Sequence, residues 1–98
     1  MNAVTVTVCL LLTAASSASQ ARETLPADVA RYVARRDLCD HFRGEEPYDA
    51  ERRTFLKRSM RRYCTGTDAR LATLKRKYRA RSEVMSKLGE YEETIEGQ

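Results

Sequence analysis

The sequence contains one histidine, three cysteines, two prolines and no tryptophan among its 98 residues. It also lacks a Gly-rich phosphate loop, a nucleophile elbow and the zinc-binding helix signature of metalloproteases. A chain this short has little room for a cleft that would raise a carboxylate pKa, so its acidic clusters are expected to be solvated surface groups. We therefore expect neither an enzyme nor a cofactor.

The first 21 residues carry no charged side chain, and an apolar run from Val4 to Ala15 is followed by small residues. This layout is typical of a secretory signal peptide. The run is shorter than the roughly 20 apolar residues that span a membrane. Small residues allow cleavage after Ala18 or Ala21, and we favour the bond between Ala21 and Arg22 because charge begins there. An uncleaved apolar anchor is the alternative, whereas Cys9 lacks the preceding small residue of a lipidation signal.

The charges are divided into three segments. All 18 basic and 14 acidic residues lie beyond position 21, so the exported product keeps a net charge of +4. Residues 22–51 are net acidic, residues 52–81 contain one acidic residue among many basic ones, and residues 82–98 are acidic again. The acidic flanks are expected to fold back and neutralise the centre. In the alternative interpretation, the centre meets an external anion such as a lipid headgroup or an acidic protein.

Apolar residues recur at helical spacing beyond the leader, and they nowhere alternate as in a strand. We expect an all-α fold, with residues 22–98 forming one small bundle of three to four helices. The helices are expected at residues 26–42, 49–63, 67–80 and 82–95, with a break near 79–82. Asp49 and Thr67 are expected to cap the second and third helices, and Gly66 to end the second.

The second expected helix has an apolar side and a basic side. Its apolar residues fall within about 140° of arc: Phe55, Leu56, Met60 and Tyr63. The cations on the remaining surface form a candidate face for an anion or a partner: Arg53, Lys57, Arg58, Arg61 and Arg62. Few acidic residues lie three or four positions from them, so the usual Glu–Lys ladder is largely missing. The apolar side is expected to form bundle core, with insertion into an anionic membrane surface as the alternative.

Two cysteines, Cys39 and Cys64, remain after the leader, and an exported chain with two cysteines is expected to form one disulfide. In a compact hairpin, Cys64 would lie about 20 Å from Cys39. The bond therefore requires an extended segment over residues 43–49, with Tyr48 available to pin it to the core. A metal site of Cys39, His41 and Cys64 is not expected, because side chains two positions apart on a helix diverge by about 200° and no fourth ligand stands at a recognisable spacing. Catalysis by a Cys39–His41 pair is not expected for the same geometric reason.

From Arg31 to Tyr91 the chain resembles a group of small exported proteins of Gram-negative bacteria, through RRDLCDHFRGE, PYDAERR and YCTGTDARLATLKRKY. That resemblance implies export and a Cys39–Cys64 pair, and it brings no assigned activity. The last element is similar to the Cys-then-Leu-rich helix of lysozyme-inhibitor-like (LprI-type) periplasmic domains, although Lys75 stands where those domains carry an aspartate. This second similarity covers one helix and indicates a candidate partner class.

These features favour a small periplasmic or secreted protein that acts as an interaction or inhibitor module. Its expected partner is another envelope or secreted protein and not nucleic acid. An inhibitor could use the acidic flank against a cationic enzyme or the basic face against an acidic partner. The alternative function is peripheral binding of anionic envelope surfaces through the basic amphipathic helix at residues 50–63. We expect a monomer or a weak oligomer, and no metal.

Overall fold

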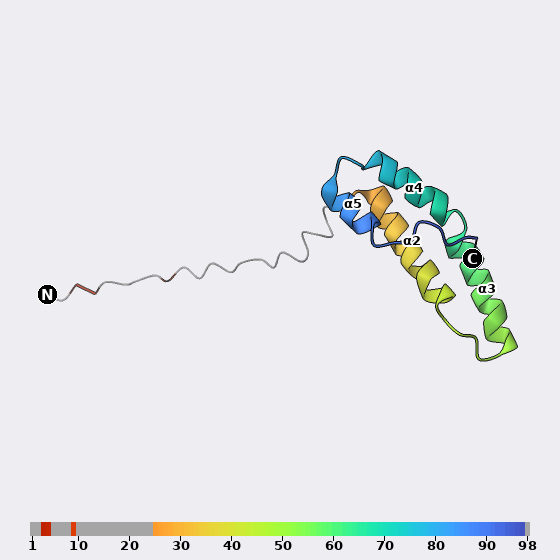
Figure 1. Cartoon of the computed structure of the whole chain (residues 1–98). Coiled ribbons are helices and arrows are strands. Elements are labelled where there is room, and N and C mark those ends of the chain that lie inside the picture. Colours follow the sequence, from red (N-terminus) through yellow and green to blue (C-terminus); the bar gives the residue numbers. More distant parts are fainter. Residues whose placement is uncertain (1–2, 5–8, 10–24, 98) are drawn as a thin grey trace.

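The computed structural model describes Ala3, Val4, Cys9 and residues 25–97. Across this part the chain forms helices and no strand, which confirms the all-α fold. The helices are α2 (Ala27–Arg43), α3 (Ala50–Cys64), α4 (Thr67–Lys77) and α5 (Ser82–Leu88). In Figure 1, α3 runs back along the end of α2, and α4 and α5 follow on the way back towards the start of α2. The expected cleavage sites, after Ala21 or Ala18, lie outside the described residues.

The hydrophobic core lies between α2, α4 and α5. Helical spacing brings its members to one side of each helix, and burying each side chain of this size contributes about 1.5–3 kcal/mol. The core residues are Val29, Tyr32, Leu71, Leu74, Val84 and Leu88. Because α2 supplies the first part of this core and also contacts α3, it is the central helix of the domain.

The apolar side of α3 packs against the second half of α2. The Phe42 ring stacks on Tyr63 and meets Phe55 edge-on, with centroids 5.8 Å apart in both pairs. Leu56 is 3% exposed, whereas Phe55 is 39% exposed at the margin of the contact. The apolar side of α3 is therefore partly covered by the protein itself, with Leu56 buried and Met60 and Tyr63 half-buried.

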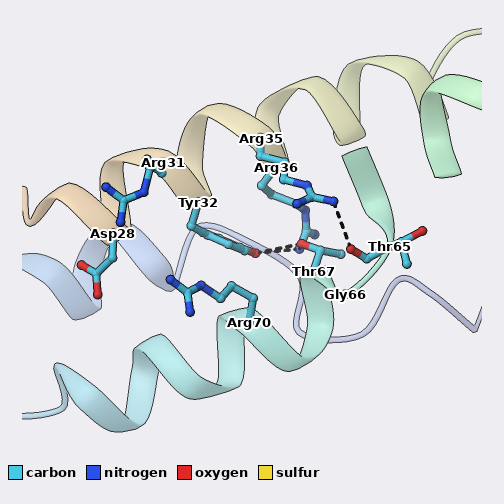
Figure 2. A pocket seen from close by; sticks show the side chains of 9 residues that line it. All are labelled: Asp28, Arg31, Tyr32, Arg35, Arg36, Thr65, Gly66, Thr67 and Arg70. Atoms are coloured by element: carbon cyan, nitrogen blue, oxygen red, sulfur yellow. Dashed lines mark hydrogen bonds between the residues drawn. The ribbon is translucent and has the colours of Figure 1, made fainter. Parts of the chain in front are cut away.

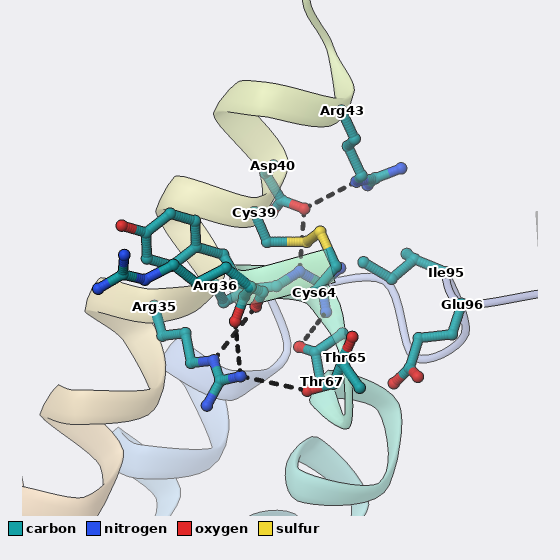
Figure 3. The surroundings of a disulfide bond; sticks show 12 residues. Arg35, Arg36, Cys39, Asp40, Arg43, Cys64, Thr65, Thr67, Ile95 and Glu96 are labelled. Carbon is teal, nitrogen blue, oxygen red and sulfur yellow. Dashed lines mark hydrogen bonds and ion pairs between the residues drawn. A yellow bond between two sulfur atoms is a disulfide. The ribbon is translucent and has the colours of Figure 1, made fainter. Parts of the chain in front are cut away.

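Cys39 and Cys64 form the expected disulfide, with Cα atoms 5.0 Å apart (Figure 3). The bond is possible because residues 44–49 leave α2 without helical structure, so that α3 begins beyond α2 and returns along it (Figure 1). The expected role of Tyr48 is wrong, since this residue is 79% exposed. Arg52 holds the segment instead, because its Nε and Nη2 atoms each donate a 2.8 Å hydrogen bond to the Glu45 carboxylate.

The helix caps explain where α3 begins and ends. The Asp49 carboxylate accepts a 2.7 Å hydrogen bond from the backbone N–H of Arg52, so the expected N-cap is present. Gly66 separates α3 from α4 with a φ of +82°, a left-handed conformation that favours glycine. The expected cap at Thr67 is wrong: Thr67 is the first residue of α4, and its hydroxyl donates to the Tyr32 hydroxyl at 3.3 Å.

Both C-terminal helices are shorter than expected. The helices expected at residues 67–80 and 82–95 end at Lys77 and Leu88. Residues 89–97, which we call the C-terminal strap, leave α5 and return to the turn between α3 and α4 (Figure 1). The backbone beyond Leu88 does not continue α5, because its amide groups find hydrogen-bond partners on α4.

One end of the C-terminal strap is fixed by α4. The Asp68 carboxylate accepts the backbone N–H groups of Ile95 at 3.0 Å and Glu96 at 3.1 Å. The Glu96 carboxylate in turn accepts the backbone N–H of Asp68 at 2.9 Å. Ile95 is buried by this arrangement, which a continued helix would have carried away from α4.

Replacing both Cys39 and Cys64 by alanine is expected to lower the free energy of unfolding by about 3.5 kcal/mol, because the unfolded chain regains the entropy of a 25-residue loop. Urea denaturation followed by circular dichroism measures the change. The reduced wild-type protein is the control and should resemble the double variant. Equal stability of the oxidised protein and the variant would contradict this expectation.

Candidate functional site

Arg36 is a charged side chain at the centre of the protein, and it is 1% exposed. Its guanidinium donates to the Asp40 carboxylate at 2.9 Å, the Tyr32 hydroxyl at 3.1 Å and the backbone carbonyl of Glu92 at 3.1 Å. The guanidinium carbon also lies 5.5 Å from the centroid of the Tyr91 ring. Arg36 therefore joins α2 to the C-terminal strap. Figure 3 shows Asp40 between Arg36 and Arg43, which lies farther along α2 and also donates to the Asp40 carboxylate.

The protonation states of Arg36 and Tyr91 preserve the contacts between α2 and the C-terminal strap at neutral pH. Burial disfavours the charged form of Arg36, but its hydrogen bonds to Asp40 and Tyr32 outweigh that effect and raise the pKa of Arg36. Burial, together with a 2.8 Å hydrogen bond to the Asp37 carboxylate, raises the pKa of the Tyr91 hydroxyl. The arginine is thus charged and the tyrosine neutral.

Arg36 was not among the residues expected to matter, although a signal for it is present. It follows Val29 and Tyr32 and precedes Cys39 at intervals of three, four and three residues, so it shares their buried stripe. Arginine is rarely buried unless it is paired. One partner of Arg36, the backbone carbonyl of Glu92, lies 56 positions away in the sequence, so local spacing does not reveal this pairing.

A cleft of about 500 Å³ lies between α2 and α4 and reaches the turn that joins α3 to α4 (Figure 2). We call it the arginine cleft, because it is lined by Arg31 and Arg35 of α2, Arg70 of α4 and the buried Arg36. Arg31 and Arg70 are exposed. Neither guanidinium has a hydrogen bond or an ion pair within residues 25–97.

Arg35 has a structural role at the edge of the arginine cleft. Its guanidinium donates to the backbone carbonyls of Arg62 at 2.8 Å and Thr65 at 3.4 Å. These carbonyls stand at the C-terminal end of α3, where helical carbonyls have no partner within the helix. Arg35 thereby fixes the end of α3 to α2, and it keeps its positive charge beside the cleft.

Among the described residues that line the arginine cleft, Asp28 is the single acidic one. Hydrogen bonds from Lys77 and from the Tyr78 hydroxyl, each 2.7 Å long, lower the pKa of Asp28 from 3.8 to about 2. The negative charge of Asp28 is therefore matched by Lys77, and the rest of the lining is left cationic.

The five predicted cations of α3, which we call the basic face, are all exposed. They are Arg53, Lys57, Arg58, Arg61 and Arg62. None of their side chains takes part in the ion pairs of the described chain. Arg62 does contact a ring, with its guanidinium carbon 5.4 Å from the centroid of Tyr63. The structure thus places all five cations on the solvent side of α3.

The acidic flanks neutralise basic side chains that lie outside the basic face. Lys75 pairs with Glu93 at 3.0 Å, and Arg52 pairs with Glu45 at 2.8 Å. Together with the Lys77–Asp28 pair, these contacts join the flanks to α4 and to the first turn of α3. Internal compensation is therefore real but partial, since it leaves out the basic face.

In the described ranges, no group of three or more His, Cys, Asp or Glu side chains could hold a metal ion. His41, part of the metal site considered above, is exposed near the end of α2. Among the same residues, no helix combines the length and the apolarity that crossing a membrane requires. Comparisons of the chain with protein-family models, curated proteins and solved structures find no match.

Replacing Arg36 by methionine is expected to lower the free energy of unfolding by about 2–3 kcal/mol, because it leaves several buried polar groups without their charged partner. Hydrogen exchange at the backbone amides of the C-terminal strap should accelerate. The matched control is Arg43→Met, which removes another cation bonded to Asp40 but an exposed one, and it should cost less than about 1 kcal/mol. Similar losses in the two variants would contradict a central role for Arg36.

Stability in acid is expected to depend on Asp28. Its folded-state pKa of about 2 lies below the ordinary 3.8, so its contribution is complete above the unfolded value and is lost as the pH falls towards 2. Asp28→Asn should therefore weaken the decline in unfolding free energy between about pH 4 and 2. Urea denaturation at a series of pH values measures this slope. Glu93→Gln is the control, and an unchanged slope in Asp28→Asn would contradict the assignment.

Proposed function

We propose that this protein is a small exported helical interaction module, periplasmic or secreted, that binds an acidic protein partner through the basic face of α3. The observation that carries the proposal is the set of five exposed cations without ion pairs in the described part of the chain. A surface of one sign attracts a partner of the opposite sign, accelerates the encounter and loses strength as salt increases.

The internal ion pairs favour an acidic partner over a cationic enzyme. An inhibitor of a cationic enzyme would need free carboxylates gathered on one surface. Asp28, Glu45 and Glu93 are each paired with a basic side chain. Glu46 and Glu51 are among the exposed acidic residues without an ion pair in the described flanks. The unpaired charge that gathers on one helix is positive. The proposal therefore assigns binding to the basic face and gives the acidic flanks a structural role.

Two features support export. Disulfides persist in oxidising compartments, and Cys39 and Cys64 are joined in the folded domain. The uncharged apolar segment that opens the sequence has the layout of a secretory leader. Both features support the proposed periplasmic or extracellular location.

Binding to an anionic envelope surface is the second candidate, and the basic face supplies the charge for it. Interfacial helices also bury an apolar side among the lipids. In α3 that side is packed on α2 through Leu56 and through the rings of Phe42 and Tyr63. Insertion would require this contact to open, so we favour a protein partner.

The proposal is tested by reversing charge on the basic face. Lys57→Glu/Arg61→Glu is expected to weaken binding to the principal acidic envelope protein that crosslinks to the wild type by at least tenfold, because like charges would then face each other. Arg76→Glu/Arg79→Glu makes the same change in net charge at exposed positions outside the basic face. It should retain binding. Crosslinking in native envelopes identifies the partner, and titration of the purified partner measures the affinity.

Two results would contradict the proposal. Equal loss of binding in both charge-reversed variants would show a dependence on net charge and not on the basic face. Sedimentation with vesicles of anionic phospholipid, without any protein partner, would favour the membrane candidate. Binding to vesicles should disappear at high salt if it uses charge alone.

A further inference from the structure

The arginine cleft has the composition of an anion-binding site. Arg31 projects from α2 and Arg70 projects from α4, and both line the cleft together with Tyr32 (Figure 2). Arg35, fixed by the end of α3, adds a third guanidinium, and the carboxylate of Asp28 is already matched by Lys77. Cations gathered in a recess without free carboxylates attract a counter-ion more strongly than the same charges spread over a surface.

The end of the cleft also contributes a positive potential. Thr65, Gly66 and Thr67 line it where α4 begins, and the N-terminal end of a helix favours negative charge. Gly66 occupies the N-cap position and offers no side-chain oxygen to the free amides of α4. Glu96 accepts the backbone N–H of Asp68, so part of this helix end already has a partner. The guanidinium groups are therefore the main attraction and the helix end an addition.

We infer that the arginine cleft binds a phosphate oxyanion, either inorganic phosphate or the phosphate of a small monoester. One arginine fork is enough for the two oxygens of a carboxylate, whereas a phosphate presents oxygens in several directions. That arrangement suits Arg31 on the α2 wall and Arg70 on the α4 wall, with the start of α4 at one end of the cleft. The volume of about 500 Å³ also leaves room for the organic part of a monoester. This site is separate from the basic face, so it goes beyond the proposed function.

The test is a titration of the purified chain with sodium phosphate at constant ionic strength, followed by NMR of the backbone amides and the arginine Nε–H groups. We expect saturable shifts at Gly66, Thr67, Arg31 and Arg70. The variant Arg31→Gln/Arg70→Gln should bind at least tenfold more weakly, and circular dichroism should show that it is folded, because neither side chain has a partner in the described structure. Arg76→Gln/Arg79→Gln removes the same charge outside the cleft and should bind within twofold of the wild type.

A second titration with glycerol phosphate separates the two sources of the ligand. Tighter binding of glycerol phosphate assigns the cleft to monoesters, and preference for the free ion assigns it to inorganic phosphate. The inference is overturned if neither ligand saturates, if the shifts spread over the basic face with the same midpoint, or if both glutamine variants bind alike. The charge-reversed variant Lys57→Glu/Arg61→Glu should still bind phosphate, so this proposal and the proposed function can fail independently.

Discussion

The buried guanidinium of Arg36 makes the helices and the C-terminal strap depend on one another. Removing a charge from water costs several kcal/mol, and the cost is offset only where the charge is well paired. Asp40 and Tyr32 on α2 supply part of this pairing, and the backbone of Glu92 in the strap supplies the rest. If the strap were displaced, the guanidinium would lose a hydrogen bond and the ring of Tyr91 together. The strap is therefore held against the core by Arg36.

The neighbouring residue on α2 fixes the other side of the domain. Arg35 points about 100° away from Arg36 around the helix and binds the last carbonyls of α3. One turn farther along α2, the disulfide from Cys39 to Cys64 holds the same end of α3 covalently. Arg35 thus attaches α3 to α2, and Arg36 attaches the C-terminal strap to α2. Both segments lie outside the α2–α4–α5 core. Lysine could not replace them equally, because only guanidinium reaches several acceptors from one rigid fork.

How well the fold could be predicted from sequence varies with the distance between the interacting residues. The start of α3 follows from Asp49, whose partner lies three positions away. The disulfide and its extended connection follow from chain length and the reach of a sulfur bridge. The strap does not follow, because Asp68 binds an amide 27 positions away and competes with the helix that the local pattern favours. The basic face was predictable as one stripe, whereas the arginine cleft combines residues 39 positions apart.

The sequence by itself determined the helical class, the cysteine pair, the starts of the helices and the separation of charge along the chain, because each of these depends on composition or on short-range spacing. Only the tertiary structure decided which charges are neutralised, where the last helix ends and which cations line a common cleft. Those outcomes depend on packing between distant segments, and local propensity carries no information about partners that the folded chain alone brings together.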